Sequence, residues 1–474
     1  MTKPSGWKQV LLLIPLCAAM AVAAHAQTFN VLASFDGTNG AYPELSLVQG
    51  TDGNLYGTTS AGSWDGGTVF KITRHGELTT LHSFCADGGI CGDGYSPGQL
   101  VLATNGDFYD TTNVGGGSVT PRIRYGSGTF FQITPTGMFR TLRGSCSCFS
   151  PLIQGTDDNF YGSTGASIFR MTLAGTVTTL HSPIPLSSIP GGGLVEANDG
   201  NFYGIGGGNN LCFGGPCGGI SKVTPFGESM TLYNFCSQPG CTDGAAPNPP
   251  LILARDGNLY GTTSDLLVSP GVGTVFRVTL NGTLTTLHKF CTATIRQIGC
   301  ADGSEPFAPL VEATDGNFYG TTAFGGDHNK GVVFKITPQG ALTTVYSFCS
   351  QSNCDDGADP EGGLLQATDG KLYGTTTVSA GTAGFGEVFS LDVGLGPFVA
   401  FVHNSGKVGQ TGGILGQGLT GTTNVLLNGT PANFTVVSDT FIEATVPAGA
   451  TSGYVTVTTP SGVLTSNVMF RVLP

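Results

Sequence analysis

Charged side chains are scarce in this 474-residue sequence, because Asp, Glu, Lys and Arg together make up 11% of it. Such a composition excludes a fold built mainly from water-exposed helices and favours short strands joined by tight turns. Basic residues are the scarcer sign, with 19 Lys and Arg against 31 Asp and Glu and a formal net charge of −12. An acidic surface repels phosphate groups, so we expect neither nucleic acid nor an anionic membrane as a partner.

Long apolar runs are equally scarce. One run, from Val10 to Ala24, follows Lys3 and Lys8 and ends at the small residues of Ala24-His25-Ala26. This pattern is typical of an export signal, so residues 1–26 are predicted to be a signal peptide. No second run of about 18 apolar residues follows. We therefore expect no integral membrane segment in the mature chain, and a location in the periplasm, at the cell surface or outside the cell.

Glycine, in contrast, is abundant at 76 residues, and many glycines belong to an internal repeat. A segment of the type TDGNLYGTT recurs seven times, centred on Tyr56, Tyr109, Tyr161, Tyr203, Tyr260, Tyr319 and Tyr373. Each copy is followed by a run of the type GTVFKIT, and most copies by one of the type LTTLHSF. Together with the short run before each Asp-Gly turn, these runs predict four antiparallel strands in each unit of about 50 residues, which is the blade of a β-propeller.

The ends of the repeat region predict closure. The seventh copy stops after EVFSLD, whereas the run from Phe29 to Phe35 is one spare outer strand at the start of the chain. We predict that this N-terminal strand completes the last blade, so that residues 27–394 form a seven-bladed propeller without open sheet edges. A linear β-solenoid is the alternative. In the propeller the Asp-Gly turns lie on one face, and the variable loops on the opposite face are the expected place for function.

The three recurring segments DGNLYGTT, GTVFKIT and LTTLHSF resemble the GloVer tandem repeat, a family of exported bacterial proteins thought to be propeller-like. The resemblance covers about residues 28–392 and implies fold and export, but no activity. The last segment, residues 395–474, resembles an IPT/TIG domain through its glycines, the strand NVLLNGTPANF and the VTVTTPSG hairpin. Alternating strands there also favour an immunoglobulin-like β-sandwich, which would serve as a spacer or interaction module.

Twelve cysteines follow residue 26, and they fall into local couples. In an oxidising compartment such couples favour disulfides, and zinc ligation by converging couples is the alternative. We predict disulfides within the couples Cys85/Cys91, Cys212/Cys217, Cys236/Cys241, Cys291/Cys300 and Cys349/Cys354. Cys146 and Cys148 are separated by one residue, which strains a disulfide ring, so the state of this pair is left open.

Several repeated polar residues could suggest chemistry, but a structural role explains them more simply. The Asp of each DGN segment fits a tight turn, and His82, His181 and His288 share one outer-strand position that cannot converge around a ring. The Asp-Gly that follows four cysteine couples leaves calcium binding as an alternative. No cofactor and no metal ligand is otherwise predicted.

Residues that break the repeat pattern are better binding candidates, because the fold does not require them. They are Trp64, Asp65, Arg122, Arg124 and Tyr125. An arginine pair can hold a carboxylate, and exposed aromatic rings stack on sugars. We find no GxSxG, HExxH or Walker-type motif and predict no catalytic residue.

The sequence therefore predicts a secreted or cell-surface binding or scaffold protein whose variable loops contact an extracellular carbohydrate or protein. An extracellular hydrolase or lyase acting on polysaccharide or peptide is the alternative.

Overall fold

The computed structural model describes most of the chain after residue 26. The described ranges are 27–62, 66–86, 91–116, 128–144, 151–164, 167–181, 190–206, 208–212, 215–264, 272–291, 299–379 and 384–474. Across these ranges the chain is all-β, with two short 3-10 helices, Pro239–Cys241 (η2) and Ser352–Cys354 (η3), and no α-helix. None of the described helices has the length and apolarity to cross a membrane. The predicted signal peptide lies outside the described residues.

One repeat shows why the sequence forms a sheet. In the first repeat, β2 (Val48–Gln49), β3 (Leu55–Thr59), β4 (Thr68–Ile72) and β5 (Leu78–Ser83) pair in chain order, each antiparallel to the next. β-branched and aromatic residues dominate β3 and β4 and are buried there. The turn between β2 and β3 closes at Gly53, whose φ of 76° is readily adopted only by glycine.

The same order of strands recurs through the repeat region. The second and third repeat sheets contain β6 (Tyr95–Pro97), β7 (Val101–Leu102), β8 (Phe108–Val114), β9 (Thr129–Ile133) and β10 (Phe139–Gly144), then β11 (Ile153–Gln154), β12 (Phe160–Ser163), β13 (Ile168–Met171) and β14 (Val177–His181). The fourth contains β15 (Pro190–Glu196), β16 (Phe202–Gly206), β19 (Gly219–Val223) and β20 (Ser229–Asn234), with a small hairpin of β17 (Leu211–Cys212) and β18 (Gly215–Pro216). The fifth and sixth contain β21 (Pro247–Leu253), β22 (Leu259–Thr263), β23 (Thr274–Val278) and β24 (Leu284–Lys289), then β25 (Val311–Glu312), β26 (Phe318–Thr322), β27 (Val332–Ile336) and β28 (Leu342–Ser347).

The last repeat sheet joins the two ends of the repeat region. It has the order β1-β31-β30-β29, from β1 (Thr28–Ser34), β31 (Glu387–Asp392), β30 (Leu372–Thr376) and β29 (Leu365–Gln366). β1 pairs antiparallel with β31, so that Thr28 faces Asp392 and Ser34 faces Glu387. The spare N-terminal run thus occupies the outer position that the seventh copy lacks, as its sequence predicts.

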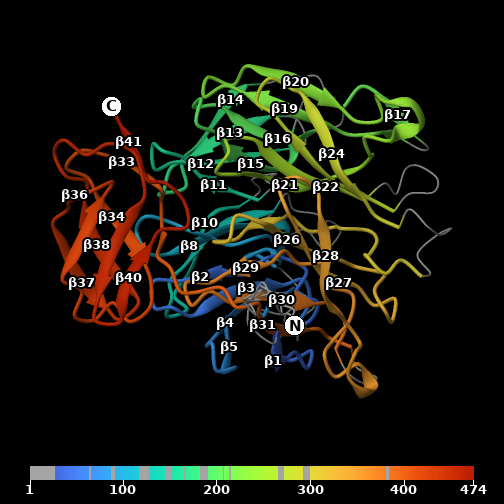
Figure 1. Cartoon of the computed structure of the whole chain (residues 1–474), viewed down its shortest axis with the longest axis horizontal. Coiled ribbons are helices and arrows are strands. Elements are labelled where there is room, and N and C mark those ends of the chain that lie inside the picture. The colour runs from blue at the N-terminus through green and yellow to red at the C-terminus, as the bar shows by residue number, and fades with distance from the viewer. Residues whose placement is uncertain are drawn as a thin grey trace, which may run out of the picture.

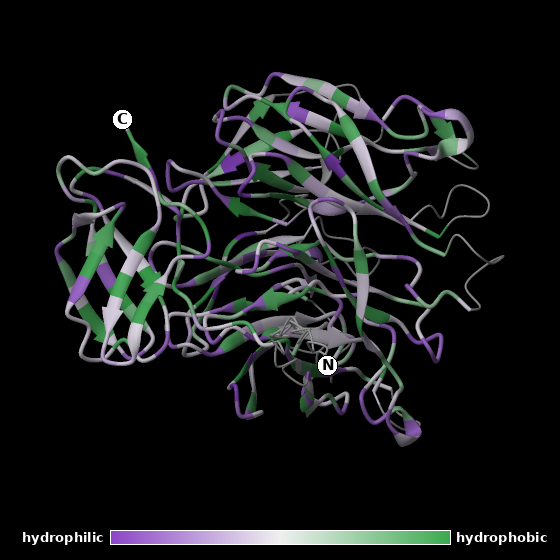
Figure 2. Ribbon diagram, viewed as in Figure 1, coloured by the Kyte–Doolittle hydropathy of each residue, from purple (hydrophilic) through white to green (hydrophobic). Residues whose placement is uncertain are grey.

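Aromatic residues pack the repeat sheets against one another. The buried Tyr of one repeat contacts the Phe that precedes the equivalent Tyr of the next, with ring centroids 4.2 Å apart for Tyr56 and Phe108 and 4.1 Å apart for Tyr260 and Phe318. Figure 2 shows apolar residues concentrated along these strands and many hydrophilic residues in the connecting loops. The core is therefore a series of apolar layers between neighbouring sheets.

The C-terminal region forms three further sheets beside the repeats (Figure 1). One has the order β32-β34-β38-β37, from β32 (Ala400–Phe401), β34 (Thr411–Leu415), β38 (Phe441–Thr445) and β37 (Phe434–Ser438). A second has the order β36-β35-β39-β40, from β36 (Thr430–Pro431), β35 (Asn424–Leu427), β39 (Val455–Thr459) and β40 (Gly462–Thr465). The third pairs β33 (Ser405–Lys407) in parallel with β41 (Arg471–Leu473). These sheets enclose their own apolar core around Ile442 and Val457.

Candidate functional site

The aspartates of the DGN turns hold the turns together. The Asp52 carboxylate accepts a hydrogen bond of 2.8 Å from the Tyr56 hydroxyl and another of 2.7 Å from the Asn54 side chain. The same Asp–Tyr bond recurs at Asp157–Tyr161, Asp199–Tyr203, Asp256–Tyr260, Asp315–Tyr319 and Asp369–Tyr373. Burial and the Asp199 carboxylate raise the pKa of Tyr203 to about 12. These aspartates therefore bind structural partners, and the tyrosines stay protonated.

A second recurring bond fixes the cysteine-closed loops. His82 Nε2 lies 2.9 Å from a carboxylate oxygen of Asp93, and His288 Nε2 lies 2.9 Å from Asp302. Where the repeat has Tyr in place of His, the hydroxyl donates instead, at 2.8 Å to Asp243 and 2.7 Å to Asp356. Burial would raise the pKa of Asp302, but the His288 bond and the Cys291 amide hold it below its usual value.

Five disulfides close loops in the described structure: Cys85–Cys91, Cys212–Cys217, Cys236–Cys241, Cys291–Cys300 and Cys349–Cys354. The couple Cys146/Cys148 lies outside the described residues. Two couples of the fourth repeat do meet in space, because the Sγ atoms of Cys212, Cys217 and Cys236 lie within 4.8 Å of one another. Among the described residues this is the group that could hold a metal, but its sulfurs are engaged in disulfides and offer no thiolate.

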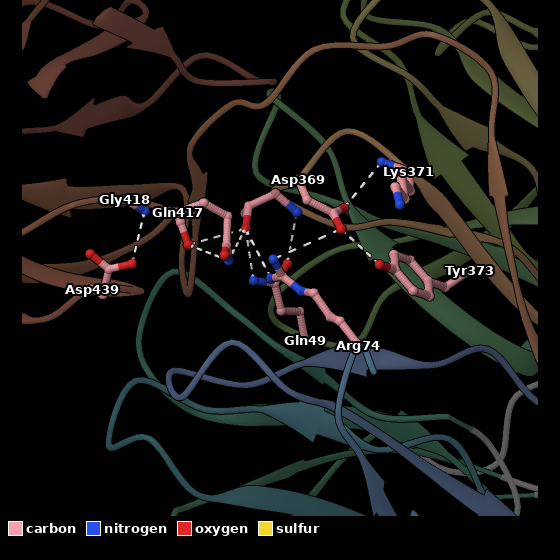
Figure 3. Close-up of polar contacts among 10 residues, drawn as sticks. Gln49, Arg74, Asp369, Lys371, Tyr373, Gln417, Gly418 and Asp439 are labelled. Atoms are coloured by element: carbon pink, nitrogen blue, oxygen red, sulfur yellow. Dashed lines mark hydrogen bonds and ion pairs between the residues drawn. The ribbon is translucent and has the colours of Figure 1, made fainter. Parts of the chain in front are cut away.

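The C-terminal sheets cover the end of the repeat sheets that carries the Asp-Gly turns, which we call the turn end. Thr368 of the seventh repeat is the centre of this junction, since its Oγ1 lies 2.9 Å from Gln49 Nε2, 3.2 Å from Gln417 Nε2 and 3.3 Å from the Gly416 carbonyl. Figure 3 shows Gln417 approaching this point from the C-terminal side, where Asp439 bonds Gly418, and Gln49 and Arg74 approaching from the first repeat. Thr440 extends the contact by donating to the Thr51 carbonyl at 2.8 Å.

The opposite end, which we call the loop end, carries the loops after the GTT segments and the cysteine-closed loops. These two kinds of loop bond to each other, as in the 3.0 Å hydrogen bond from the Gly116 amide to the Cys91 carbonyl. Three carboxyl groups gather there, from Glu44 in the first repeat and from Asp359 and Glu361 in the seventh. We call these three residues the acidic group. Burial raises the pKa of Glu361, and the nearby charges of Glu44 and Asp359 raise it further.

The other two carboxyl groups of this acidic group respond in the same way. Burial raises the pKa of Glu44, although a 3.4 Å hydrogen bond from the Ser60 hydroxyl opposes the change. Burial also raises the pKa of Asp359, whose ion-pair partner Lys330 is 3.8 Å away and lowers it only in part. The acidic group thus concentrates more negative charge than its single described lysine neutralises.

A pocket of about 180 Å³ opens beside Glu44. Its polar lining includes Ser60 of the first repeat and Ser96, Gln99 and Asn113 of the second, and the third repeat adds Pro151. The sequence analysis missed both the pocket and the acidic group. A sequence pattern could have located two of the acids, because Pro43-Glu44 and Pro360-Glu361 occupy equivalent positions in the first and last repeats.

The binding candidates predicted from the sequence lie outside the described residues. This applies to Trp64 and Asp65 in the loop after the first GTT segment, and to Arg122, Arg124 and Tyr125 in the loop after the second. The described ends of both loops, Gly62 and Gly116, are at the loop end. These five residues stay predictions, and the structure adds the acidic group at the same end of the repeat sheets.

A family model described as the Gloeobacter/Verrucomicrobia repeat matches residues 18–166, 150–389 and 292–430, which together cover most of the sequence. The chain belongs to this family. Membership confirms the predicted tandem-repeat resemblance, and the matches extend into the C-terminal region. No curated protein sequence matches this member of the family.

Solved structures with β-propeller-type folds resemble this family member. A catalytically inactive virginiamycin B lyase from Staphylococcus aureus, solved with quinupristin, has a TM-score of 0.51 at 14% identity, over 77% of this chain and 99% of the lyase. The extracellular domain of a candidate hybrid two-component system from B. thetaiotaomicron has a TM-score of 0.49 at 12% identity, over 95% of this chain and 60% of that one. A gluconolactonase from Xanthomonas campestris has a TM-score of 0.39 at 11% identity, over 79% and 92%. The first likeness supports a propeller-like fold.

Proposed function

We propose that this protein is an exported binding protein that contacts an extracellular carbohydrate or protein segment with its loop end. The observation that carries the proposal is the asymmetry of the two ends. The C-terminal sheets occupy the turn end through Thr368, Gln417 and Thr440, whereas the loop end presents a polar pocket and the acidic group. Loops on a rigid all-β scaffold are a common place for binding sites.

The pairing of β1 with β31 supports the proposed architecture of the repeat region. Residues 1–26 would be removed as a signal peptide, and residues 27–394 would form a seven-bladed propeller in which β1 and β31 join the ends of the ring. Residues 395–474 would form an IPT/TIG-type immunoglobulin-like domain that serves as a spacer or second contact. Disulfides, which are typical of oxidising compartments, support a location at the cell surface, in the periplasm or outside the cell.

The charge at the loop end restricts the chemical classes of ligand that would fit there. Burial raises the pKa of Glu44, Asp359 and Glu361, and repulsion from Glu44 and Asp359 raises the pKa of Glu361 further. A ligand that brings a positive charge or several hydroxyl donors would relieve this cost. Amino sugars, basic peptide segments and hydroxyl-rich glycans have this chemistry, and the predicted Trp64 would add a stacking surface.

An extracellular hydrolase or lyase is the second candidate. The observation that favours it is again the raised pKa of Glu44 and Glu361, since a carboxyl group that stays protonated can act as a general acid. The lyase of similar fold is described in complex with quinupristin, so this type of fold accommodates both a ligand and catalysis.

The test is a screen of the purified, oxidised protein against polysaccharide and glycopeptide arrays, read for both retention and product release. A binding protein should be retained on the array without releasing products. Retention should be weaker in the triple variant Trp64→Ala, Arg122→Ala, Arg124→Ala and in Glu44→Gln. Release of products that stops in Glu44→Gln or Glu361→Gln would establish the enzymatic candidate instead. Retention that neither variant changes would show that the loop end is not the binding surface.

A further inference from the structure

A second cavity lies where the C-terminal sheets meet the turn end. Its volume is about 370 Å³, and it lies between the third to fifth repeats and the C-terminal sheets. Thr156, Asn198 and Leu253 line it from the repeats, and His403 and Met469 from the C-terminal side. Ligand sites in proteins are often found at such junctions between two packed units, and this volume is within their usual range.

The charged groups of this junction cavity neutralise each other. Arg471 of β41 lies 3.5 Å from the Glu196 carboxylate of β15 and also donates to the Ala197 carbonyl at 3.3 Å. Glu196 in turn accepts two hydrogen bonds of 2.9 Å from the amide and hydroxyl of Thr156. Because both charges are already engaged, the cavity offers no unpaired charge to an ionic ligand, and a neutral ligand is favoured.

Three asparagine side chains of the cavity, in contrast, are not engaged, whereas Gln154 and Thr156 are. Within the described residues, the side-chain amides of Asn198, Asn404 and Asn467 form no hydrogen bond, and the Asn467 Oδ1 atom is buried. His403 uses Nδ1 toward Ser405, at 3.2 Å from its carbonyl oxygen, which leaves Nε2 available. A buried acceptor without a partner costs free energy that a hydroxyl donor would recover.

Apolar surface lies next to these polar groups. The Met469 side chain is 48% exposed, and Phe401 lines the same cavity. Side-chain amides donate and accept hydrogen bonds in one group, as sugar hydroxyls do, and apolar side chains pack against the C–H faces of a sugar ring. A charged, flat or purely apolar ligand would leave part of this lining unmatched.

We propose that the junction cavity binds a neutral saccharide of one or two rings, with Asn198, Asn404 and Asn467 bonding its hydroxyl groups and Met469 packing against a ring face. This site is separate from the loop end and does not depend on the function proposed for it. Because its lining comes from both parts of the chain, saccharide binding would also hold the C-terminal sheets against the repeats.

The probes are maltose, cellobiose and N,N′-diacetylchitobiose, titrated into the full chain by isothermal calorimetry and followed by saturation-transfer NMR. At least one of the three is expected to bind. Asn404→Ala should weaken its binding about tenfold, the effect of removing one hydrogen-bonding group. Asn198→Trp, which fills the cavity from the repeat side, should abolish binding. Both residues are exposed, so neither change disturbs a core.

The matched control is Asn433→Ala, because Asn433 is an exposed asparagine of the C-terminal region that does not line the cavity. Its affinity should equal that of the unchanged protein. Glu44→Gln at the loop end should also leave this binding unchanged, which separates the two sites. Failure of all three saccharides to bind, or equal affinity in Asn198→Trp, would overturn the proposal.

Discussion

His82 and Asp93 are joined by a contact of 2.9 Å that links the outer strand β5 to the segment directly after the Cys85–Cys91 disulfide. The imidazole ring also stacks on Phe139 of the second repeat, with ring centroids 3.7 Å apart. One side chain therefore connects a strand, a loop and the neighbouring repeat. The recurrence of this contact at His288 and Asp302 indicates that it belongs to the scaffold.

His82→Ala is expected to lower the free energy of unfolding by about 1–2 kcal/mol, because Asp93 loses a hydrogen-bond partner and Phe139 loses its stacking partner. Chemical denaturation monitored by fluorescence measures the change. A double-mutant cycle with Asp93→Ala should show coupling between the two sites. His75→Ala, at an exposed turn position, is the control, and strictly additive effects of His82→Ala and Asp93→Ala would contradict a direct interaction.

Phe29→Ala tests the pairing of the N-terminal strand with the last repeat. Phe29 of β1 stacks on Tyr346 at 4.1 Å and on Phe389 at 5.3 Å, so its loss should cost about 2–3 kcal/mol and loosen β1 from β31. Thermal unfolding and proteolysis near residue 28 should both show the effect. Phe226→Ala is the control, because the Phe226 side chain is 87% exposed. Equal stability of the two variants would mean that β1 contributes little to the fold.

Glu361→Gln tests the charge of the acidic group. Burial and neighbouring acids raise the folded pKa of Glu361 above its ordinary value of 4.5, so this carboxyl favours folding only while it is protonated. That contribution is present below the unfolded pKa and is lost as the pH rises through the folded pKa. The variant should therefore be more stable than the unchanged protein at pH 7, by about 1–2 °C in Tm, and equal to it near pH 3.

The control for this pH comparison is Glu77→Gln, at an exposed position of the turn end away from the acidic group. Its Tm should follow that of the unchanged protein at both pH values. A loss of stability in Glu361→Gln at pH 7 would show that the Glu361 carboxylate has a stabilising partner and would contradict the repulsion described above.

The double variant Cys349→Ser, Cys354→Ser removes one short disulfide. A loop of this size is expected to contribute about 2 kcal/mol by restricting the unfolded chain, and the Tyr346–Asp356 hydrogen bond should hold the folded loop in place. Denaturation midpoints with and without a reducing agent give the comparison. The unchanged protein should lose stability on reduction. The variant should lose less, because it has only four of the five described disulfides to be reduced.

The repeat architecture could be predicted because the same sequence pattern recurs in each repeat. The DGN turn, the buried Tyr and the two following strands occur together, so local pattern and strand pairing agree. The substitution of Asn105 for Asp in the second repeat fits the same role, since its side chain donates to the Tyr109 hydroxyl at 3.0 Å. The predicted all-β class and the N-terminal strand pairing follow from such repetition.

The sites could not be predicted in the same way, because they form between segments far apart in sequence. Glu44 and Glu361 come together only because the first and last repeats are neighbours, and Arg471 meets Glu196 only because the C-terminal sheets dock on the turn end. Cysteine spacing also does not predict that Cys212, Cys217 and Cys236 converge within a single repeat. Sequence spacing alone does not define these contacts.

The pairing of β1 with β31 also sets an order of events during synthesis. β1 leaves the ribosome before every other described strand. Its hydrogen-bond partner β31, which ends at Asp392, is synthesised more than three hundred residues later. Until then β1 presents an unpaired strand edge, which is prone to associate with other chains. The last repeat can therefore form only after nearly the whole chain is present, so a prematurely terminated product would carry an adhesive N-terminus.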